Sequence, residues 1–138
     1  MYVRNATPAD ALEIRRILDA AMLEPGDVDV RIREGDVLVA VEGSPSNAGT
    51  TTDAADGRIV GAIVLEPGEE ADHIAALAVR KRRRDRGIGT ALVDAALDRR
   101  RRLTANFDER VRPFYESLEF AIEPIDDRRS RGVRSREE

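Results

Sequence analysis

The residues best suited to chemistry in this chain of 138 residues are a glycine pair and the basic run before it. Six basic side chains and one aspartate occupy positions 80–86, directly after an apolar segment that ends at Val79. Gly87 and Gly89 then open a second apolar segment with helical period. A helix start offers unpaired backbone N–H groups and a positive dipole end, and glycine lets a phosphate approach them. The pattern therefore predicts an anion site between a strand and a helix.

The spacing around the glycines excludes two common nucleotide-binding motifs. The dinucleotide fingerprint requires a third glycine at the position that Leu92 occupies. A P-loop requires a lysine before the hydroxyl residue, whereas Thr90 follows Gly89 directly. A third pattern is still compatible with the spacing. It consists of a glutamine or arginine, any two residues, a glycine, any one residue, and then a glycine or alanine. Residues 84–89 fill this pattern.

Composition limits the class of protein. A hydrophobic content of 41% with 36% charged residues is typical of one soluble globular domain. The absence of cysteine excludes disulfides, thiolate catalysis and cysteine zinc sites, and we expect no metal. Neither a signal peptide nor a spanning segment is present, so we expect a cytoplasmic protein that does not bind membranes.

Charge is distributed unevenly along the chain. The net charge is −4, but basic residues cluster at 80–86, 99–102 and 128–136, and only Lys81 among them is not arginine. The clusters favour an anionic ligand. The acidic total argues against general nucleic-acid affinity, and the basic run contains no aromatic residue on which a base could stack.

Periodicity predicts the elements that must position the glycine loop. Strand patterns occur at 2–4, 37–41, 58–65, 73–79, 103–107 and 120–125. Helix patterns follow Thr7 for about fifteen residues, begin again near Gly87, and extend from Asp108 to Leu118, where Pro113 predicts an irregular first turn. Residues 27–34 remain open between helix and loop, and 43–57 read as a flexible hairpin connection.

The order of these elements predicts an α/β (α+β) fold with a mixed sheet. Three strands follow one another, and a right-handed β-α-β crossover through the glycine loop then adds a parallel strand. We expect one domain over residues 1–125. For the arginine-rich tail 126–138, fraying and a weak last strand both remain open.

A second motif lies about 30 residues after the loop. Residues 108–120, DERVRPFYESLEF, together with the loop pattern, resemble the GCN5-related N-acetyltransferase (GNAT) family over the chain up to about Ile125. The resemblance implies a mostly antiparallel central sheet with helices on both faces and the crossover at the cofactor site. It also implies acetyl-CoA as the donor and a primary amine, on a small molecule or a peptide, as the acceptor.

The resemblance assigns the cofactor contacts. Backbone N–H groups of the loop and helix start would hold the pyrophosphate, and the last residues of the preceding strand would pair with the pantetheine amides. The residues carried over are Leu77, Ala78, Val79, Arg84, Asp85, Arg86, Gly87, Ile88, Gly89, Thr90 and Asp108.

It also assigns the chemistry. Tyr115 matches the family's general acid, although an aromatic residue beside Phe114 could simply pack. His73 is a candidate base, because imidazole can accept a proton near neutral pH; a solvent-facing histidine is the competing interpretation. Alternative bases are the nearby carboxylates Glu66, Glu69, Glu70 and Asp72. The backbone N–H of Val79 is the candidate contact for the oxyanion.

Two residues depart from the family pattern. Asp108 stands where asparagine is usual, which changes a polar contact near the cofactor. Glu119 stands where glycine is usual, at a cost of about 1 kcal/mol if its φ is positive.

Two other functions therefore remain open: a non-catalytic CoA-binding or regulatory module and, more remotely, a nucleic-acid-binding module. A homodimer is also left open. The acceptor site would be shaped by residues 20–36 and the last strands. Acids there could attract a cationic amine or simply form a solvated face: Glu24, Asp27, Asp29 and Glu34.

Overall fold

A computed structural model describes residues 1–23, 26–42, 58–80, 87–99 and 102–135. The predicted connection 43–57 and the predicted cofactor residues Arg84, Asp85 and Arg86 lie outside these described residues. The described strands are β1 (Tyr2–Asn5), β2 (Val37–Glu42), β3 (Arg58–Glu66), β4 (Asp72–Val79), β5 (Arg102–Asp108), β6 (Ala121–Pro124) and β7 (Arg129–Ser135). The helices are α1 (Ala11–Ala20), α2 (Val28–Arg33), α3 (Ile88–Arg99) and α4 (Arg112–Ser117). Short 3-10 turns at Pro8–Asp10 and Glu109–Val111 precede α1 and α4.

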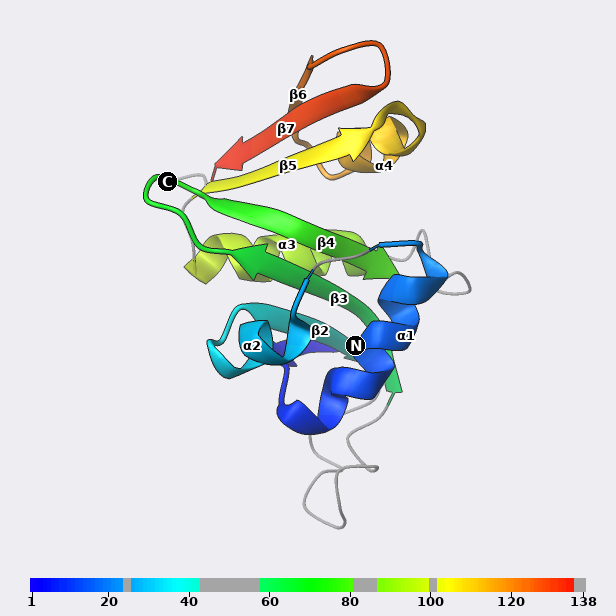
Figure 1. Ribbon diagram of the computed structural model, residues 1–138, viewed down its shortest axis with the longest axis vertical. Coiled ribbons are helices and arrows are strands. Elements are labelled where there is room, and N and C mark those ends of the chain that lie inside the picture. The colour runs from blue at the N-terminus through cyan, green and yellow to red at the C-terminus, as the bar shows by residue number, and fades with distance from the viewer. Residues whose placement is uncertain (24–25, 43–57, 81–86, 100–101, 136–138) are drawn as a thin grey trace.

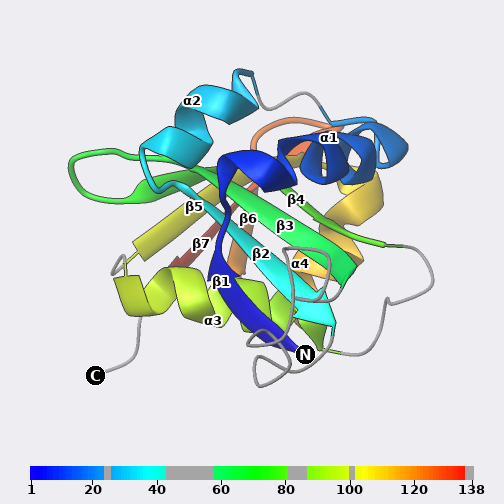
Figure 2. The same ribbon diagram turned by 90° about the horizontal axis from the view of Figure 1, so that it is seen from below.

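The seven described strands form one sheet in the order β1-β2-β3-β4-β5-β7-β6. Every pairing is antiparallel except that of β4 with β5, which α3 connects. The sheet lies between α3 on one side and α1 with α2 on the other (Figure 2). The predicted mixed, mostly antiparallel sheet with helices on both faces and one crossover is therefore confirmed.

Two apolar clusters hold these layers together. Alternate residues of β4 and β5 pack with α3, Tyr115 and Leu118 on one face of the sheet. On the other face, β2, β3 and β4 pack against α1 and α2. Strands β2 and β3 are buried on both faces, as their nearly continuous apolar sequences predict.

Local polar contacts begin the helices on the second face. The backbone N–H of Thr7 donates to the Asp10 carboxylate at 2.7 Å, and Arg4 binds the same carboxylate at 2.8 Å. Residues 27–34, which the sequence left open, contain α2, whose first turn is capped by the Asp27 carboxylate accepting from the Val30 N–H at 3.2 Å. Both contacts satisfy N–H groups that a helix start leaves unpaired.

Helices α1 and α4 end in the same type of turn. In α1 the N–H of Leu23 donates to the Leu18 carbonyl, and in α4 the N–H of Phe120 donates to the Tyr115 carbonyl. This Schellman geometry puts the preceding residue in the left-handed region that glycine favours. Here the residues are Met22 (φ 61°) and Glu119 (φ 66°), so the condition under which the sequence predicted a backbone cost at Glu119 is met.

Residues 129–135 of the arginine-rich tail form β7, which lies between β5 and β6 (Figure 1). Its pairing with β5 extends from Arg102 opposite Ser135 to Asp108 opposite Arg129. Buried Ser130 and Gly132 alternate with more exposed residues along it. The tail therefore contributes a strand to the interior of the sheet.

Candidate active site

The sheet opens between its two parallel strands. The pairing of β4 with β5 is limited to Asp72 with Leu103 and His73 with Thr104. Beyond these residues the strands diverge, and β5 moves away from β4 together with β7, β6 and α4 (Figure 1). A wedge therefore opens toward the carboxyl ends of both strands.

The backbone of β4 directs polar groups into this wedge. The N–H of Arg80 donates to the Val60 carbonyl of β3 at 2.8 Å. Because successive N–H groups of a strand point to opposite sides, those of Val79 and Leu77 point away from β3, toward β5. This direction is the one that the predicted pantetheine and oxyanion contacts require.

The wedge contains a cavity of about 740 Å³. Its walls come from β4, β5, the α1–α2 connection, α4 and the start of β7. The described lining residues are Ala21, Met22, Leu23, Ile74, Ala75, Ala76, Leu77, Ala78, Val79, Asn106, Phe107, Asp108, Arg110, Val111, Phe114, Tyr115 and Arg129. Predominantly apolar walls with a few polar groups are typical of ligand sites.

Tyr115 is held in this wall by three aromatic rings. Its ring stacks on Phe107 at 4.2 Å between centroids, with an interplanar angle of 7°. Phe114 and Phe120 pack against it edge to face at 5.4 and 5.3 Å. The Phe120 contact accompanies the Schellman turn of α4, so the helix end itself positions the ring.

Burial also determines the protonation state of Tyr115. The residue is only 7% exposed, and desolvation raises the pKa of its phenol to about 12. Its side chain makes no hydrogen bond with other described residues. The phenol is therefore protonated at neutral pH, and its hydroxyl is available as a donor in the cavity wall.

Gly132 of β7 makes room for this aromatic group. A Cβ atom at this position would come within 3.1 Å of both the Phe107 and Phe120 rings. The aromatic packing around Tyr115 therefore depends on a glycine in the segment that the sequence assigned to the tail.

The start of α3 adjoins the same wall. Gly87 has a φ of +78° and its carbonyl accepts the Ala91 N–H at 3.0 Å, so it directly precedes α3, which begins at Ile88. The Cβ position of Gly89 lies 3.4 Å from the Phe114 ring, which lines the cavity. The first N–H groups of the helix, at Ile88, Gly89 and Thr90, have no acceptor within the helix. They form the described part of the predicted phosphate site.

His73 lies at the closed end of the wedge. Its Nδ1 is 3.0 Å from the Thr104 hydroxyl, within the short parallel pairing. His73 does not line the cavity, whose wall along β4 begins at Ile74. The alternative bases Glu66, Glu69, Glu70 and Asp72 do not line it either. The base assignment therefore stays a prediction, and a proton would have to reach any of these groups through water.

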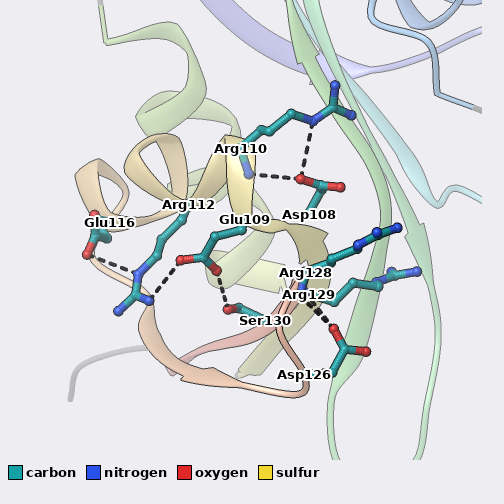
Figure 3. Close-up of polar contacts among 9 residues, drawn as sticks. All are labelled: Asp108, Glu109, Arg110, Arg112, Glu116, Asp126, Arg128, Arg129 and Ser130. Carbon is teal, nitrogen blue, oxygen red and sulfur yellow. Dashed lines mark hydrogen bonds and ion pairs between the residues drawn. The ribbon is translucent and has the colours of Figure 1, made fainter.

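Several polar side chains interact around the end of β5, the turn that follows it and the start of β7 (Figure 3). The Asp108 carboxylate accepts from the Arg110 backbone N–H at 2.9 Å and from its Nε at 3.2 Å. These contacts, the backbone N–H above all and then the guanidinium charges of Arg110 and Arg129, lower the pKa of the Asp108 carboxyl. Asp108 thus caps the turn before α4 and is negatively charged.

The structure brings together part of the predicted site. Leu77, Ala78, Val79, Asp108 and Tyr115 line one cavity, and Gly89 at the start of α3 lies next to Phe114, which lines the same cavity. Sequence reasoning assigned no site role to several lining residues, among them Asn106, Phe107, Arg110 and Arg129, and it covered Met22 only through the segment 20–36 expected to shape the acceptor site. Only Phe107 carried a usable signal, because it continues the alternation of β5. Among the described residues, no group of three or more His, Cys, Asp or Glu side chains could hold a metal ion.

Comparison with known proteins agrees with this geometry. Residues 34–122 match the model of the acetyltransferase (GNAT) domain, which covers more than half of the chain. This chain belongs to the GNAT acetyltransferase family. No curated protein matches the sequence.

Many solved structures share the fold. Ard1 from Thermoplasma volcanium has a TM-score of 0.71 at 20% identity, over 99% of this chain and 97% of that one. Rv2747 from Mycobacterium tuberculosis, solved in complex with CoA, has a TM-score of 0.69 at 18% identity, over 98% and 99%. N-acetylglutamate synthase from Neisseria gonorrhoeae, complexed with coenzyme A and L-arginine, has a TM-score of 0.70 at 17% identity, over 96% and 32%. Identities this low show the fold alone.

Proposed function

We propose that this protein is an N-acetyltransferase that moves the acetyl group of acetyl-CoA to a primary amine by direct attack. The observation that carries the proposal is the position of Tyr115, buried in the wall of a wedge whose other wall is the part of β4 beyond its pairing with β5. Family membership supports acyl transfer, and two of the three solved structures described above contain coenzyme A.

The described residues fit such a donor. The N–H groups of Leu77 and Val79 point into the wedge, and the start of α3 offers N–H groups for phosphate oxygens. The cavity is mostly apolar, as an alkyl chain requires. No helix of the described chain is long and apolar enough to cross a membrane.

Acetyl-CoA supplies a thioester for the amine to attack. The Val79 N–H stabilises negative charge that develops on the carbonyl oxygen. The Tyr115 hydroxyl, protonated because burial raises its pKa to about 12, donates a hydrogen bond and a proton to the leaving sulfur. His73, oriented by Thr104, accepts the proton of the amine through water.

Ligand binding and turnover test the proposal together. Acetyl-CoA at 100 times its Kd should stabilise the protein by about 2.7 kcal/mol and raise its melting temperature. An unchanged melting temperature at millimolar acetyl-CoA would contradict the proposal. Binding without acetylation across peptides, amino acids, polyamines and aminoglycosides would favour the non-catalytic alternative instead.

The role of His73 has a separate test. In a His73→Asn variant, kcat/KM should fall by about tenfold at neutral pH, and the decline of activity on the acidic side should change position. A Thr104→Val variant should show a smaller effect of the same kind, because it removes only the orienting contact. An unchanged pH profile in the His73 variant would remove the base assignment.

A further inference from the structure

The two sides of the cavity differ in chemistry. Leu103, Ala105 and Phe107 of β5 face the cluster formed with α3 and α4. Because side chains alternate along a strand, Asn106 and Asp108 face the side of α1 and α2. Lining residues 21–23, at the end of α1, lie on this second side. Tyr115 therefore belongs to one side of the wedge, and the second side is left for the acceptor.

Charge on the acceptor side is positive. The charged residues among the described lining residues are Asp108, Arg110 and Arg129. Arg129 lies opposite Asp108 in the β5–β7 register, so the two side chains share a face of the sheet. Figure 3 shows these three side chains extending to the same side. With two guanidinium groups and one carboxylate, this part of the wall carries a net single positive charge.

The guanidinium groups of Arg110 and Arg129 have N–H donors that are not used by other described residues. Asp108 binds Arg110 through its backbone N–H and Nε, and the Arg110 side chain is 87% exposed. The Arg129 side chain forms no hydrogen bond or ion pair with another described residue, although its backbone N–H donates to Asp126 at 2.9 Å. Both side chains can therefore present planar N–H forks to a ligand.

The acids that could have attracted a cationic amine are engaged elsewhere. Asp27 caps α2, Asp29 pairs with Arg15, and Glu34 pairs with Arg31 at 3.5 Å. Glu24 lies outside the described residues. None of Asp27, Asp29 and Glu34 lines the cavity.

We propose that the acceptor is an amine that also carries a carboxylate, as an amino acid does, and that Arg110 and Arg129 bind this carboxylate while the amine points toward Tyr115. This inference rests on the proposed acetyltransferase function and names the acceptor class of that same site. A carboxylate matches the net single positive charge of the wall. A phosphate monoester would bring nearly two negative charges beside the Asp108 carboxylate and is disfavoured.

The test compares L-amino acids with their carboxamides, which keep the amine and lose the negative charge. For the native protein, kcat/KM should be at least about tenfold higher for the acids, the size of one charge-assisted hydrogen bond. Arg129→Ala should remove most of this preference through the acceptor KM, and Arg129→Lys should restore part of it. Arg131→Ala, two residues along the same face but outside the cavity wall, should leave it unchanged. The Kd of acetyl-CoA should stay the same in all three variants.

Several results would overturn the inference. Equal use of acids and carboxamides would do so, as would an Arg129→Ala variant that keeps the full preference. A loss of acetyl-CoA affinity in that variant, with the acceptor preference intact, would assign Arg129 to the cofactor. If the native protein does not bind acetyl-CoA at all, that result would instead contradict the proposed function.

Calorimetry provides a readout without turnover. N-acetyl amino acids should bind the CoA-saturated protein at least about tenfold more tightly than N-acetyl carboxamides, and Arg129→Ala should abolish the difference. Equal binding of the two products would also overturn the inference.

Discussion

The two sides of the β4–β5 wedge differ in how their side chains are held. On the side of α3 and α4, Tyr115 is stacked between aromatic rings and positioned by a helix-ending turn. On the side of α1 and α2, the Arg110 side chain is held by one contact with Asp108, and the Arg129 side chain is held by no hydrogen bond or ion pair with another described residue. Packed rings fix the hydroxyl of a proton donor, whereas long, solvated arginines can adapt to a ligand. The difference suggests a fixed chemical side and an adaptable acceptor side.

Removal of the Tyr115 hydroxyl should have the largest effect on catalysis. Tyr115→Phe keeps the aromatic packing, so acetyl-CoA should bind with unchanged Kd while kcat falls by about 10²- to 10⁴-fold. Tyr2→Phe, at the other tyrosine, is the matched control, because Tyr2 does not line the cavity. Full turnover by the Tyr115 variant would remove the proton-donor assignment.

The alkaline stability of the protein measures how deeply the Tyr115 side is buried. The phenol has a pKa of about 12 in the folded protein and about 10 when unfolded, so the unfolded state loses its proton first as the pH rises. Its contribution to stability is complete below pH 10 and is lost toward pH 12, by up to about 2.7 kcal/mol. The free energy of unfolding of the native protein should therefore fall relative to that of Tyr115→Phe as the pH rises from 10 to 12, as denaturant unfolding of both proteins would measure. Parallel curves would show that the phenol is not buried.

The two glycines at the cofactor end should respond differently to substitution by alanine. Gly87→Ala places a Cβ in open space but at a positive φ, so we expect a loss of about 1–2 kcal/mol, divided between stability and acetyl-CoA affinity. Gly89→Ala places its Cβ at ordinary contact distance from Phe114 and should be nearly neutral. Thermal unfolding and calorimetry of both variants measure the two contributions. Equal losses in the two variants would contradict the distinction between them.

The smallest effect concerns the turns that end α4 and α1. Glu119→Gly relieves a non-glycine residue at a φ of 66° and should stabilise the protein by about 1 kcal/mol. Met22→Gly, at a φ of 61°, is the matched variant on the acceptor side; its side chain is 89% exposed, so little packing is lost. Both should raise the midpoint of denaturant unfolding. A lowered midpoint for Glu119→Gly would mean that the glutamate side chain contributes more than the strain costs.

The chemical side of the wedge was largely predictable from sequence. The crossover after Val79 follows from apolar period and the glycine pair, and Tyr115 follows from the second motif. Both signals are local, because strand, loop and helix are contiguous in the chain. The wedge itself was not predictable by period or spacing, since it depends on where the β4–β5 pairing stops.

The acceptor side was mostly not predictable, for a physical reason. Arg129 reaches the cavity because β7 pairs with β5, about twenty residues earlier in the chain, and a strand rich in arginine carries no apolar alternation. The left-handed turn at Met22 could not be predicted, because the position is not occupied by glycine, the residue that usually marks such a turn. Asp27 and Asp29 were candidate ligand groups by sequence, but Asp27 caps α2 and Asp29 pairs with Arg15, and neither partner can be read from residue type alone.

A crystal structure with bound coenzyme A tests the central claim most directly. The pantetheine should run between β4 and β5, with its amides at the N–H groups of Leu77 and Val79. The sulfur should lie within about 3.5 Å of the Tyr115 hydroxyl, as proton donation requires. Coenzyme A bound outside the wedge, or with its sulfur remote from Tyr115, would contradict the account.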